Sequence, residues 1–123
     1  MTWLTLVPPA ELESLLLTHP QVADAGVIGV YSEAKATELP RAYVVPATPI
    51  DQLSEVNRKA LARAIGEWVA SKVSQHKRLR GGVVLVNVIP KSPSGKILRK
   101  ILRERAKNEE VEEVEDKRRE SKL

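Results

Sequence analysis

Apolar residues are spaced in two different ways along this chain of 123 residues, and the difference limits the folds open to it. Between Ser54 and Ser74 they recur every three or four positions, which is the spacing of one helix face. Residues 22–31, 41–45 and 82–88 instead form short dense apolar runs, which are typical of buried strands. The pattern predicts one α+β domain, with a small sheet of about three main strands flanked by helices.

Other signals place the remaining elements. Pro8-Pro9 followed by acidic residues predicts the start of a short helix, and His19-Pro20 predicts its end. Ser54 is the expected N-cap of the long helix. The polar residues 32–39 are expected to form a loop, and a last helix is expected to begin near Ile97.

The domain is expected to occupy residues 8–106, after an atypical or remnant lead-in at 1–7. Residues 107–123 read as a charged tail, helical or disordered, because Val111 and Val114 are its only apolar residues before the C-terminus.

Composition excludes several classes of function. The chain has no cysteine, which rules out disulfides, thiolate metal sites and cysteine nucleophiles. His19 and His76 stand alone without metal-ligand spacing, so no metal site is expected. No apolar stretch is long enough to predict a membrane span.

Positive charge is concentrated between Lys72 and Lys107, where eleven Lys or Arg residues face one acid, Glu104. Such a band is either a solvated surface or a partner for phosphate groups. A nucleic-acid partner is not expected, because the chain has only two Trp and two Tyr, and none is interleaved with these basic residues.

A lysine on a constrained turn is the strongest candidate for chemistry. Lys96 follows Ser92-Pro93-Ser94-Gly95, in which Gly95 permits positive φ and Pro93 restricts the backbone. A positioned ammonium group is suited to stabilising negative charge on phosphate or carboxylate oxygens. The alternative is an ordinary turn whose lysine points into water, and neighbouring Lys91 and Lys100 are rival candidates.

Five runs of sequence, in this order, resemble the C-terminal domain of adenylate-forming acyl-CoA synthetases, most closely the 4-coumarate–CoA ligase branch. They are Pro9-Ala10-Glu11-Leu12-Glu13, residues 19–30, residues 38–45, Lys77-Arg78-Leu79-Arg80-Gly81-Gly82-Val83 and residues 89–99. The resemblance covers roughly residues 7–105.

The resemblance implies a mobile lid that closes over a large N-terminal domain. In that family the lysine matching Lys96 contacts the carboxylate and the α-phosphate during adenylation. Gly95, directly before it, is a candidate cofactor-binding residue. The domain then rotates to present another face to CoA, for which Lys77, Arg78, Arg80 and Gly81 are the candidate contacts. ATP, with magnesium, and CoA are co-substrates of the complete enzyme, and this chain alone is expected to hold none of them.

The family's hinge and its Lys-Gly-Phe-Gln-Val loop have no counterpart at residues 3–7, where only Val7 agrees. The chain is therefore expected to be a truncated, split or stand-alone ligase piece that needs a large domain, in cis or in trans, for activity. The alternative is an inert regulatory module that docks on an intact ligase. Ser121-Lys122-Leu123 matches a peroxisomal address, which implies an import receptor as partner and the peroxisome, otherwise the cytoplasm, as location.

Overall fold

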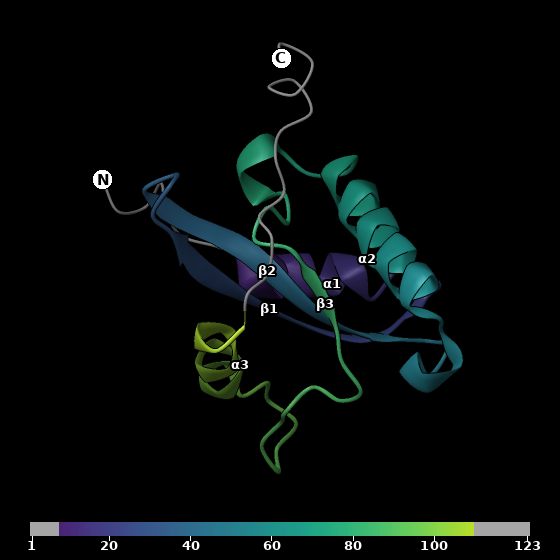
Figure 1. Cartoon of the computed structure of the whole chain (residues 1–123). Coiled ribbons are helices and arrows are strands. Elements are labelled where there is room, and N and C mark those ends of the chain that lie inside the picture. The colour runs from purple at the N-terminus through teal and green to yellow at the C-terminus, as the bar shows by residue number, and fades with distance from the viewer. Residues whose placement is uncertain (1–7, 110–123) are drawn as a thin grey trace.

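The computed structural model describes residues 8–109 and forms a three-stranded sheet with helices on both faces (Figure 1). The elements are, in order, α1 (Pro9–Leu16), β1 (Val22–Ser32), β2 (Thr37–Pro46), α2 (Glu55–Ala70), β3 (Val83–Leu85) and α3 (Arg99–Lys107). Two short 3-10 turns, η2 (Ile50–Gln52) and η3 (Gln75–Lys77), flank α2. The α+β class expected from the sequence is confirmed. The expected lead-in at 1–7 and the predicted peroxisomal signal at 121–123, with most of the predicted tail, lie outside the described residues.

β2 is the central strand of the sheet. It pairs antiparallel with β1 and parallel with β3, so β1 forms one edge. Alternate side chains of β2 enter two separate cores, as the period of a strand requires. Ala42 and Val44 face α1 and α2, whereas Tyr43 faces α3. This division places α1 and α2 on one face and α3 on the other (Figure 1).

Several predicted boundaries were shifted. The hairpin of β1 and β2 extends into the expected loop at 32–39, because backbone pairing continues to Ser32 and Thr37. The third strand is only Val83–Leu85, and α3 begins two residues after Ile97 because Ile97 forms an antiparallel bridge with Lys91. α2 ends at Ala70 rather than near Ser74.

The long helix keeps its predicted cap but buries only part of its length. The Ser54 side chain accepts a hydrogen bond from the Asn57 amide at 3.1 Å, which satisfies a free N–H of the first turn. Val56, an expected member of the apolar face, is 75% exposed. Packing against the sheet is made further along, where Ile65 and Val69 are buried.

Tyr43 ties the sheet to the end of α3. Its ring is fully buried, and its hydroxyl donates to Glu109 Oε1 at 2.7 Å. Arg105 donates to the other oxygen of Glu109, and its guanidinium carbon lies 5.6 Å from the centre of the Tyr43 ring. Burial, and then the hydrogen bond to Glu109, raise the pKa of Tyr43 above its ordinary value of 10.0.

The raised pKa of Tyr43 predicts how stability responds to alkali. The neutral phenol is favoured by folding, so its contribution is complete below pH 10 and is lost as the pH rises through the higher folded-state pKa. In a Tyr31→Phe variant, Tyr43 is the only tyrosine, and ultraviolet titration of the folded chain should give a midpoint above 10. A midpoint at or below 10 would contradict this account of its environment.

Candidate functional site

The loop that carries Lys96 lies between β3 and α3, and its backbone is closed at the base. Lys91 and Ile97 form an antiparallel bridge, and the Leu98 amide donates to the Pro90 carbonyl at 2.9 Å. The apolar side chains at this base pack on β1 across Gly26. A Cβ atom added there would lie 3.3 Å from Ile89, 3.6 Å from Ile97 and 3.0 Å from Leu102.

Ser92 organises the tip of the loop. Its amide donates to the Lys96 carbonyl at 2.9 Å, and its hydroxyl accepts from the Lys96 amide at 3.2 Å. Its own carbonyl accepts from the Gly95 amide at 2.8 Å. These bonds fix the backbone of Lys96 while its side chain stays exposed.

Gly95 has a φ of +89°, a conformation that favours glycine. No atom lies within 4 Å of the position a Cβ would occupy, so an added methyl group is penalised by backbone strain alone. The freedom predicted for Gly95 from the sequence is therefore used by the loop.

We expect Gly95→Ala to lower the free energy of unfolding by about 1 kcal/mol, the usual cost of a left-handed backbone for an L-residue. Gly95→Asn should cost less, because asparagine adopts positive φ more readily than alanine. Urea unfolding of the full chain measures both, and equal losses would contradict a purely conformational cause.

The three candidate lysines differ in their surroundings. Lys91 Nζ lies 2.6 Å from Asp24 Oδ2 and is held in an ion pair. Lys96 and Lys100 are exposed, and within residues 8–109 neither forms an ion pair. Of these two, only Lys96 stands on the closed loop, since Lys100 is in the first turn of α3. The Lys96 ammonium group is thus free to meet an anion from outside the domain.

The predicted CoA contacts occupy a different region, around the turn that follows α2. Lys77 Nζ is 2.9 Å from Glu11 Oε2 of α1. Arg78 and Arg80 each have a buried Nε without a hydrogen-bond partner in the described part of the chain. In Figure 1 the turn lies above the sheet and the Lys96 loop lies below it. Leu79 of the turn packs in the core beneath α1 and α2, whereas Ile97 of the loop packs in the core beneath α3, so the structure does not bring these two sets of residues together.

Gly81 is buried against the backbone of β2. Its amide donates to the Pro40 carbonyl at 2.8 Å, and its carbonyl accepts from Arg41 Nε at 2.8 Å. A structural reason for glycine therefore exists at this position, and contact with CoA stays a prediction.

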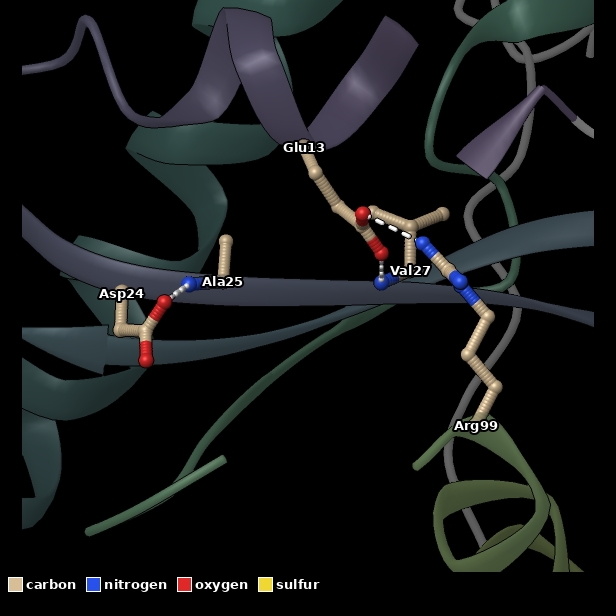
Figure 2. A network of polar contacts seen from close by, with 5 residues as sticks. All are labelled: Glu13, Asp24, Ala25, Val27 and Arg99. Carbon is tan, nitrogen blue, oxygen red and sulfur yellow. Dashed lines mark hydrogen bonds and ion pairs between the residues drawn. The ribbon is translucent and has the colours of Figure 1, made fainter. Parts of the chain in front are cut away.

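Sequence analysis did not single out three residues that hold the ends of the loop. These three are Asp24, Glu13 and Arg99. Asp24 pairs with Lys91. Glu13 accepts from Arg99 at 2.5 Å (Figure 2). One signal was available for Glu13, which lies between Leu12 and Leu16 on the buried side of α1. An acid in that position requires a partner inside the fold.

Residues 8–109 contain no cluster of three or more acidic or histidine side chains that could hold a metal ion. None of the helices in the same range is long and apolar enough to cross a membrane.

Comparison with known proteins identifies the domain. Residues 11–96 match the family model of the AMP-binding enzyme C-terminal domain. A putative acyl-coenzyme A synthetase of Emericella nidulans is 52% identical over 103 residues, covering 83% of this chain and 17% of the relative. A probable 4-coumarate–CoA ligase of Dictyostelium discoideum is 45% identical over 98 residues, covering 80% of this chain and 16% of the relative.

The fold agrees with the sequence match. The crystal structure of an anthranilate CoA ligase in complex with anthranoyl-AMP superposes with a TM-score of 0.66 at 35% identity, covering 83% of this chain and 18% of that one. The chain therefore spans about a sixth of the length of these relatives. It is similar to part of acyl-CoA synthetases and ligases, and it belongs to the AMP-binding enzyme C-terminal domain family.

Proposed function

We propose that this chain supplies the adenylation lysine, Lys96, to a larger adenylate-forming domain that binds ATP and a carboxylic acid. The carboxylate attacks the α-phosphate, pyrophosphate leaves, and an acyl-adenylate forms. Two anionic groups must approach each other in this step, and a positioned ammonium group stabilises the charge that they bring together.

The observation that carries the proposal is the presentation of Lys96. Its backbone is fixed by Ser92, its side chain is exposed, and its ammonium group has no ion-pair partner in the part of the chain that the structure describes. A lysine held in an internal ion pair, as Lys91 is, could not contribute its charge to an outside anion without first breaking that pair.

The second half of the proposal concerns CoA. After adenylation the domain turns, Lys96 leaves the site, and the basic turn at 77–81 faces the phosphates of CoA. The separation of the turn from the Lys96 loop favours this division of work, because two surfaces on opposite sides of one sheet suit two orientations of a rigid body (Figure 1). Lys77, Arg78 and Arg80 give this turn a positive charge that suits phosphate oxygens.

ATP, its magnesium ion and the acyl group are assigned to the large domain, so the chain by itself is proposed to be inactive. The partner is accordingly an adenylation domain, joined to this chain or separate from it. The acyl specificity of the complete enzyme is a property of that partner.

The proposal is tested by fusing the full chain to the large domain of an acyl-CoA ligase whose own C-terminal domain has been removed. Acyl-adenylate formation is then measured for the fusion, for the large domain alone and for this chain alone. Adenylation by the fusion well above both controls is the expected result. A fusion no more active than the large domain alone would refute the proposed function.

A further inference from the structure

Glu13 and Arg99 form an ion pair across the edge of the sheet, and this pair connects α1 to the start of α3. Glu13 comes from α1 on one side of β1, and Arg99 comes from the start of α3 on the other side (Figure 2). Glu13 Oε1 accepts from Arg99 Nη2 at 2.5 Å, and Glu13 Oε2 accepts from the Val27 amide at 2.8 Å. The Glu13 carboxylate of α1 thus contacts strand β1 and also Arg99, the residue with which α3 begins after the Lys96 loop.

A second carboxylate holds the other end of the same loop. Asp24 Oδ1 accepts from the Ala25 amide at 2.9 Å, and Asp24 Oδ2 pairs with Lys91. Ala25 and Val27 are two residues apart on edge strand β1, so both amides point to the side away from β2. The edge of the sheet therefore orients two acids, and these acids hold Lys91 before the loop and Arg99 after it.

Stability alone does not explain the arrangement. Glu13 is only 7% exposed, and burial of a carboxylate is costly unless it is paired and hydrogen-bonded. The basic partners are partly exposed, Arg99 to 32% and Lys91 to 40%. Pairs of this kind add little net stability, and their role is then sought in the geometry that they hold. The geometry fixed here is that of the segment between Lys91 and Arg99, which carries Lys96.

We infer that Glu13 and Asp24 are positioning residues for Lys96, acting through Arg99 and Lys91 to hold both ends of its loop on β1. The inference rests on the proposed function for its catalytic meaning, but the mechanical part concerns this chain alone. If the pairs are lost, the loop base can open and Lys96 spends less time where adenylation needs it. Substrate binding, which belongs to the large domain, is unaffected.

The kinetic test uses Glu13→Gln and Arg99→Met in the fused protein. Glutamine keeps an oxygen for the Val27 amide but loses the charge that holds Arg99, and circular dichroism of each variant checks that the fold is retained. We expect kcat for adenylation to fall about tenfold in each variant, with KM for ATP and acid within about twofold of the parent. The double variant should be no worse than either single one, because both changes break one pair. Unchanged kcat, or losses that multiply in the double variant, would overturn the inference.

The mechanical test uses amide hydrogen exchange in the full unfused chain. We expect the Ser92, Gly95 and Leu98 amides, which are bonded within the loop, to exchange about tenfold faster in Glu13→Gln, while Val44 in the central strand is unchanged. Equal acceleration at Val44 would indicate general destabilisation, and no change in the loop would show that the Glu13 ion pair does not hold it. Either result overturns the inference.

The matched control is Glu55→Gln with Lys59→Met, which removes an exposed ion pair of 3.7 Å on α2. It should alter neither the kinetics nor the exchange of the loop amides. The two proposals also fail separately. A fusion without adenylation refutes the proposed function. If the fusion is active but Glu13→Gln changes neither its kcat nor the exchange of the loop amides, only the positioning role of Glu13 is refuted.

Discussion

Lys96→Ala is expected to slow acyl-adenylate formation by the fused protein about 100- to 1,000-fold, the usual effect of removing one preorganised charge-stabilising donor. The ammonium group stands on a loop whose backbone is already fixed, so little reorganisation is needed when the anions arrive. Its removal should therefore appear in kcat, with smaller changes in KM. Single-turnover measurement of the adenylate checks this directly.

Lys100→Ala is the matched control for that variant. Lys100 is also exposed and lies four residues further on, but it belongs to α3 rather than to the closed loop. It should retain adenylation within about threefold of the parent, since a solvated charge contributes little. A loss at Lys100 equal to that at Lys96 would mean that general positive charge, and not one positioned cation, supports the reaction.

Gly81→Ala is expected to cause the largest loss of stability, about 3 kcal/mol, because overpacking in a closed core is expensive. An added Cβ would lie 2.8 Å from the Pro40 carbonyl oxygen, 2.9 Å from Val30 Cγ2 and 3.2 Å from the Leu39 carbonyl oxygen. The two oxygens belong to the backbone of β2 and cannot move without disturbing the sheet. Urea denaturation of the full chain measures the difference.

Gly66→Ala provides the opposite expectation at a second glycine. Gly66 lies within α2, and its added Cβ would meet only Val83 Cγ2 at 3.7 Å, an ordinary contact. Because alanine favours helix formation, this variant should gain about 0.5–1 kcal/mol. A Gly81→Ala variant as stable as the parent would contradict the steric account of Gly81, and a destabilised Gly66→Ala variant would contradict the account of Gly66.

The α+β class could be predicted from the sequence because strands and helices differ in the spacing of their apolar residues. The helix cap at Ser54 was predictable from local chemistry, and its hydrogen bond to Asn57 is present. Boundaries were harder to predict where pairing involves backbone atoms alone. Thr37 and Glu38 extend β2 although their side chains are polar, since a hairpin can continue beyond its apolar part.

The candidate loop was visible in sequence because Gly95 and Pro93 restrict the backbone beside Lys96. The residues that hold it were not visible, since Glu13 and Arg99 are 86 positions apart and meet only around the edge of β1. For the same reason, the sequence could not show that Lys91 is held in an ion pair while Lys96 is free of one within the described residues. Their difference depends on Asp24, which is remote in sequence and adjacent to Lys91 only after folding.

The most direct test of the central claim compares the two half-reactions in Lys96→Ala. The fused variant is assayed first for adenylate formation from ATP and acid, and then for thioester formation from a supplied acyl-adenylate and CoA. The account predicts a loss of about 100-fold or more in the first step and less than about tenfold in the second. Equal losses in both steps would contradict the assignment of Lys96 to adenylation.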